Sequence, residues 1–94
     1  MEELDAAVSW LSTVEAVALR WADNRVPVRY AERTIEEARD ALVKSGQGDA
    51  ARVTAATFAT VQRRNRGGVA AAIAAVHAQR EVLEARLDAA KHSQ

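Results

Sequence analysis

Four polar residues fall on helix faces that are otherwise apolar. Glu15 projects among the leucines and valines of the first helical segment, and Arg80 projects onto the apolar face of the last one. Gln62 and Asn65 share that last face with Phe58. Because an unpaired buried charge is costly, we expect Glu15 and Arg80 to contact each other. The four residues form a candidate buried polar cluster, which either sets helix register, as in coiled coils, or lines a pocket for a small anionic ligand. The remaining alternative is that a bend or a helix end moves one of them to solvent.

A dense basic run occupies residues 63–68, which read Arg-Arg-Asn-Arg-Gly-Gly. Arg63, Arg64 and Arg66 are candidate anion-binding residues, because guanidinium groups pair with phosphate and successive glycines let backbone amides approach it. The run lacks the spacing of a Walker loop or a dinucleotide fingerprint. A solvent-exposed helix face or loop is therefore the favoured interpretation.

Charge is unevenly distributed, although the net charge is zero. Residues 1–50 carry ten acids and six bases, whereas residues 51–94 carry three acids and seven bases. The two halves either pack beside each other, within one chain or across a dimer, or the basic 52–66 segment binds nucleic acid. A dedicated nucleic-acid binder usually has a basic overall balance, which favours the first interpretation.

Other catalytic or metal chemistry has little support in the sequence. The chain has no cysteine, which excludes disulfides, thiolate nucleophiles, zinc–cysteine sites and iron–sulfur clusters. His77 precedes Glu81 by four residues, but a metal site needs a further ligand, so we predict an ordinary helix-surface histidine. No Ser/His/Asp arrangement and no acid–base pair of carboxylates stands out. We predict no catalytic residue, no metal and no cofactor.

The elements that carry these residues are helices, which makes the predicted fold all-α. Pro27 ends a first helix and starts a second, and Gly46 suits the left-handed position that follows a helix. The predicted helices, within a single domain of residues 1–94, cover about 3–24, 28–45 and 49–91.

The last predicted helix carries one long apolar stripe. Its members are Phe58, Val61, Asn65, Val69, Ala72, Val76, Leu83 and Leu87. A continuous helix over 49–91 is roughly 64 Å long, too long for the other two helices to cover, so we predict completion by a second copy of the chain. The alternative is a break at Gly67-Gly68, where two glycines cost about 2 kcal/mol in a helix, and a four-helix bundle. The expected interface anchors are Trp10, Trp21, Val76, Leu83 and Leu87.

Short matches around the proline loosely resemble the start of the second helix in all-helical chorismate mutases: Arg20-Trp21, Pro27-Val28 and Arg33. The resemblance implies three helices with a long first and third member, an interwoven dimer, and a charged active-site pocket inside the bundle. The chain departs from the family pattern in having Arg33-Thr34 for an Arg-Glu pair and Val69 for a polar residue.

We therefore predict a homodimeric helical protein-interaction module, which serves as an adaptor, regulator or assembly component without catalytic activity. One alternative is a chorismate-mutase-like enzyme with a polar pocket inside the bundle. Another is a nucleic-acid-associated helical protein that uses the 52–66 segment. The acidic start and the short longest apolar run, residues 69–76, predict neither an export signal nor a membrane partner, and hence a cytoplasmic location.

Overall fold

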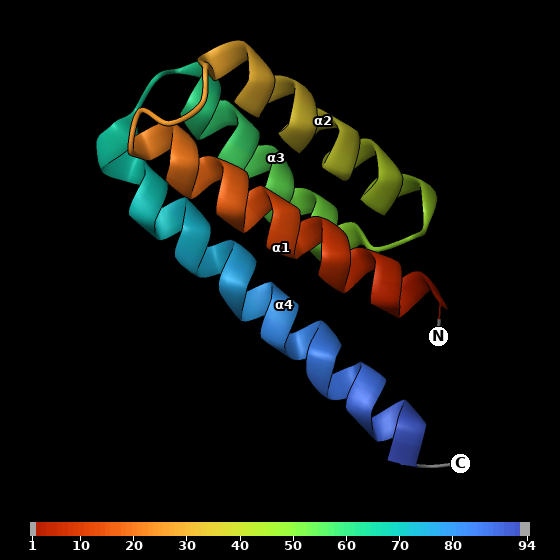
Figure 1. The fold of residues 1–94 in the computed structure, drawn as a ribbon. Helices are drawn as coiled ribbons and strands as arrows, with labels where there is room; N and C mark the ends of the chain where they lie inside the picture. The colour runs from red at the N-terminus through yellow and green to blue at the C-terminus, as the bar shows by residue number, and fades with distance from the viewer. Residues whose placement is uncertain (1, 93–94) are drawn as a thin grey trace.

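The computed structural model describes residues 2–92 and is helical nearly throughout that range, without strands (Figure 1). Consecutive helices run in opposite directions and are joined by short connections (Figure 1). In chain order they are α1 (Glu2–Ala22), α2 (Val28–Lys44), α3 (Gly48–Gln62), the 3-10 turn η1 (Arg66–Gly68) and α4 (Val69–His92). The ends of the predicted domain, residue 1 and residues 93–94, lie outside the described residues.

α1 and α3 are the two inner helices of the bundle. α1 packs against α2, α3 and α4, and α3 also packs against both α2 and α4. α2 and α4 therefore lie on opposite sides of the α1–α3 pair (Figure 1). The C-terminal end of α4 projects beyond the other helices (Figure 1). Because α1 packs against three helices, its buried apolar residues occupy more than one side of the helix.

Three helices end in the same kind of cap. After α1, α2 and α3 the chain places Asn24, Gly46 and Arg64 in the left-handed region, with φ of 61°, 75° and 55°. In each cap the next backbone amide donates to the carbonyl five residues earlier, at 2.8–3.0 Å. Glycine fits this position without strain and asparagine tolerates it, as expected for Gly46. Arginine does not fit it well, and a non-glycine residue held there costs about 1–3 kcal/mol.

The predicted continuous helix over 49–91 is wrong, because the chain reverses direction after Gln62 and the four-helix alternative is the observed one. The left-handed Arg64 ends α3, and the Asn65 side chain accepts a hydrogen bond from the Gly68 amide at 3.1 Å. A Cβ at Gly68 would lie 2.6 Å from Asn65 Nδ2, so a larger residue would displace this capping side chain. A larger residue at position 68 would therefore weaken the cap that Asn65 forms.

The apolar stripe of the last predicted helix lies inside the bundle of its own chain. Val76 and Leu83 are 0% exposed and Leu87 is 9% exposed, because α1 and α3 cover this side of α4. Trp21 is also buried, and only Trp10 of the predicted interface anchors is partly exposed. The prediction that these four enclosed side chains anchor a contact with another chain is therefore corrected: they are core residues. The reversal after Gln62 is the physical reason.

Candidate functional site

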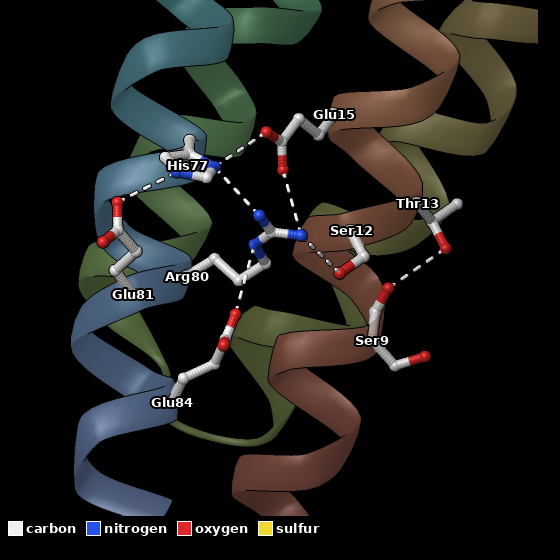
Figure 2. Close-up of polar contacts among 8 residues, drawn as sticks. All are labelled: Ser9, Ser12, Thr13, Glu15, His77, Arg80, Glu81 and Glu84. Atoms are coloured by element: carbon white, nitrogen blue, oxygen red, sulfur yellow. Dashed lines mark hydrogen bonds and ion pairs between the residues drawn. The ribbon is translucent and has the colours of Figure 1, made fainter.

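The structure brings together the two charged residues that the sequence places on apolar faces. Arg80 Nη1 of α4 lies 3.5 Å from Glu15 Oε2 of α1, and Arg80 Nη1 also donates to Ser12 Oγ at 3.3 Å. Both ionic side chains are largely covered, with 25% and 21% exposed. Arg80 also reaches outward, where its Nε lies 3.3 Å from Glu84 Oε1 (Figure 2). The pair therefore links the centre of α1 to the centre of α4.

His77 joins the same polar cluster, a contact that was not predicted from the sequence. Its Nδ1 lies 3.0 Å from Glu15 Oε1 and its Nε2 lies 2.9 Å from Glu81 Oε1 (Figure 2). Arg80 Nη2 lies 2.9 Å from the same Nδ1. The one signal in the sequence is spacing, because His77 stands three residues before Arg80 and therefore on the same side of the helix.

Both ring nitrogens of His77 contact charged side chains of the polar cluster. A general base needs a ring nitrogen within hydrogen-bond reach of a substrate proton. Here Nδ1 lies near both Glu15 Oε1 and Arg80 Nη2, so it either donates to Glu15 or accepts from Arg80, and Nε2 lies near Glu81 Oε1. Neither of the two surface cavities described below is lined by any member of the cluster. The polar cluster is therefore suited to fixing the alignment of α1 and α4, the first of the two interpretations open at the sequence level.

Gln62 and Asn65 do not belong to this cluster. Both are exposed at the end of α3, and the Asn65 side chain caps η1. Their predicted place on the apolar stripe depended on a continuous helix, so it is wrong for the same reason. Across residues 2–92, no group of three or more acidic or histidine side chains is arranged to hold a metal ion.

The predicted anion-binding arginines are all exposed. Arg63 and Arg64 lie in the connection that follows α3, and Arg66 begins η1. The basic 52–66 segment is not one continuous surface, because Arg52 lies near the start of α3 and is paired with Asp49. Arg52 and Arg63 are eleven positions apart, which is roughly 16 Å along a helix.

The outward side of α4 carries an exposed row of small apolar side chains, which we call the alanine face. Its members alternate at steps of four and three residues: Ala71, Ala75, Ala78, Val82, Ala85 and Ala89. All six are exposed, and Val82 is 43% exposed. The steps follow a heptad repeat in which Val82 takes an a position and Ala78 a d position. The face points away from α1 and α3, which cover the opposite side of α4.

Charged residues flank the alanine face on both sides. In the same heptad frame Glu81 takes a g position on one flank and Arg86 takes an e position on the other, and both side chains are exposed. Residues at g and e positions set the partner and orientation of paired helices. The positions of these two charges therefore favour one orientation of a second helix packed on this face over the opposite one.

Two of the surface cavities lie beside chain connections. One, of about 560 Å³, lies where the α1–α2 and α3–α4 connections meet, and the other, of about 450 Å³, lies between the end of α2 and the start of α3. Neither corresponds to the charged pocket inside the bundle that the chorismate mutase resemblance implies. Arg20 and Arg33, which carry that resemblance, are both exposed, and the four-helix arrangement differs from the implied three helices.

In comparisons with protein-family models, with curated proteins and with solved structures, nothing matched this chain. Among the described residues, no helix is both long enough and apolar enough to cross a membrane.

Proposed function

We propose that the chain is a non-catalytic helical interaction module that forms a homodimer through the alanine face of α4 and serves protein assembly. The observation that carries this proposal is the exposed heptad row on the side of α4 opposite the core. A helix that is buried on one side needs no apolar residues on its solvent side, where charged and polar residues are usual. Small side chains at a and d positions let two helix backbones approach closely.

Charge complementarity favours a parallel pair of α4 helices. In a parallel heptad pair, a g residue faces the e residue five positions later in the partner. Glu81 then faces Arg86 of the second copy, and the two-fold axis repeats this ion pair. An antiparallel pair centred on the same face instead brings Glu81 close to Glu81 of the second copy. The β-branched Val82 at an a position also suits a parallel dimer.

Substitution of Val82 with glutamate is expected to abolish self-association. Alanine buries little area, so we expect the parent chain to dimerise with a dissociation constant between about 1 μM and 1 mM, or −8 to −4 kcal/mol. A carboxylate at the central a position would be desolvated in the pair, which Val82→Glu therefore prevents. Sedimentation velocity over a concentration series measures the effect.

Val43→Glu is the matched control, because Val43 is 61% exposed and lies on α2 rather than on the alanine face. It should dimerise like the parent. A parent chain that stays monomeric up to about 1 mM, or equal loss of association in both variants, would rule out the alanine face as the dimer contact.

The parallel orientation has its own test. Arg86→Glu places a carboxylate opposite Glu81 of the second copy and is expected to weaken dimerisation by roughly three- to tenfold, as like charges cost a few tenths to about 1 kcal/mol at exposed sites. The double variant Glu81→Arg/Arg86→Glu reverses both charges and should restore association. An Arg86→Glu dimer as tight as the parent's would indicate the antiparallel arrangement, in which Arg86 faces no acid.

A further inference from the structure

The α1–α2 and α3–α4 connections lie at the same end of the bundle (Figure 1). Residues of both connections line the 560 Å³ cavity. The α1–α2 connection contributes Asn24, Arg25 and the Val26–Val28 stretch, and the α3–α4 connection contributes Arg64 and Arg66. Trp21, at the end of α1, forms part of its wall. A volume of this size lies within the range of about 300–1,000 Å³ that is typical of small-molecule sites.

The lining of this cavity is strongly basic. Three arginines line it and no acidic residue does. Within residues 2–92, Arg25, Arg64 and Arg66 form no ion pair, in contrast to Arg52 and Arg80. Guanidinium groups gathered without a counter-charge repel one another, and a bound anion removes that repulsion. The charge pattern therefore matches a multiply charged anion.

Arg66 is already held in place at this cavity. Its guanidinium carbon lies 5.1 Å from the centre of the Trp21 ring, within cation–π distance. Trp21 is itself 2% exposed and fixed by the core. A side chain that is ordered before binding loses less conformational entropy when a ligand arrives. Trp21 thus connects the basic cavity to the core.

Backbone strain concentrates around the same cavity. Within the described residues, Asn24 and Arg64 are the non-glycine residues with positive φ, and both line it. Glycine would fit the cap after α3 better, as it does at Gly46 after α2. The arginine at position 64 therefore weakens the cap but adds a guanidinium to the cavity, a local conflict of the kind found at functional sites.

We propose that this cavity is a binding site for a small phosphorylated molecule, held through its phosphate or pyrophosphate group. Guanidinium groups bind phosphate oxygens through paired hydrogen bonds, which suits Arg25, Arg64 and Arg66. The arginines converge on a cavity rather than on a groove, so a compact anion fits better than an extended nucleic-acid strand. The proposal is independent of the alanine face, which lies on the outer side of α4.

Pyrophosphate is the probe for this site, and Trp21 is the reporter. In a Trp10→Phe background Trp21 is the sole tryptophan, so its fluorescence follows the contact with Arg66. We expect a saturable fluorescence change with pyrophosphate at low salt. Arg64→Gly should weaken binding by about tenfold, the loss of one charge-assisted contact of roughly 1.4 kcal/mol. The same variant should melt at or above the parent temperature, because glycine relieves the strained cap.

Arg63→Gln is the matched control, because Arg63 neighbours Arg64 but does not line the cavity. It should bind pyrophosphate like the parent. The proposal is overturned if no saturation occurs by about 10 mM, or −2.7 kcal/mol, which is too weak for a built site. It is also overturned if Arg63→Gln and Arg64→Gly weaken binding equally, since that indicates diffuse charge attraction. Single-stranded oligonucleotides that bind more tightly with increasing length would indicate a nucleic-acid surface instead.

Discussion

Leu83→Ala is expected to lower the free energy of unfolding by about 2–5 kcal/mol, the usual cost of deleting a fully buried leucine side chain. Leu83 is 0% exposed and lies on the side of α4 that α1 and α3 cover. A chain of this size is stabilised by only about 5–14 kcal/mol, so the variant loses a large part of its total stability. Chemical unfolding followed by circular dichroism measures the change.

The concentration dependence of this effect distinguishes a core residue from an interface residue. Because Leu83 packs within its own chain, the loss should be the same at low and high protein concentration. The neighbouring Val82→Ala is the control, since Val82 is 43% exposed and should change monomer stability by only about 0.5 kcal/mol. A loss that shrinks as concentration rises would show that Leu83 is covered by a second chain.

Arg80→Met is expected to cost about 1–3 kcal/mol of stability, because it leaves the Glu15 carboxylate partly buried without its cation. The value is below that of a fully buried ion pair, since both side chains keep about a quarter of their surface exposed. Glu15→Gln should cost less, as the amide still accepts a hydrogen bond. The same unfolding measurement applies to both variants.

A double-mutant cycle separates the pair from its surroundings. Glu15→Gln/Arg80→Met is expected to show a coupling of about 1 kcal/mol, because the two residues contact each other directly. Arg52→Met provides the control, since the Arg52–Asp49 pair is largely exposed and such pairs contribute little. Strictly additive losses for Glu15 and Arg80 would show that the contact does not form in solution.

The helices whose ends are defined by a proline or a glycine were predictable from the sequence. Pro27 and Gly46 fix the connections around α2, and α1 and α2 match their predicted ranges to within two residues. The break between α3 and α4 was only the alternative prediction, because the apolar stripe continues in phase across it. A helix that reverses direction and packs against the same core keeps apolar residues at the same intervals, so periodicity alone does not detect the turn. Arg64 did not indicate the end of α3, because arginine is a poor residue for the left-handed position of a helix cap.

The candidate sites were predictable only in part. Glu15 and Arg80 were marked by their position on apolar faces, and a buried charge requires a partner, so their contact could be inferred. Gln62 and Asn65 were placed wrongly because they depended on the continuous helix. The basic cavity combines Arg25 with Arg64 and Arg66, which lie about forty residues apart in the sequence. No local pattern brings them together, and only the arrangement of the two connections does so.

The pairing of α1 with α4 has a consequence for the order in which the chain folds. Glu15 and His77 are 62 residues apart in sequence, whereas α2 and α3 are joined by three residues and meet locally. Closing the longer loop costs more chain entropy, so we expect the α2–α3 hairpin to form early and the contact between α1 and α4 to form late. The polar cluster lies between α1 and α4. We therefore expect it to stabilise the last helix contact that forms and not the folding nucleus.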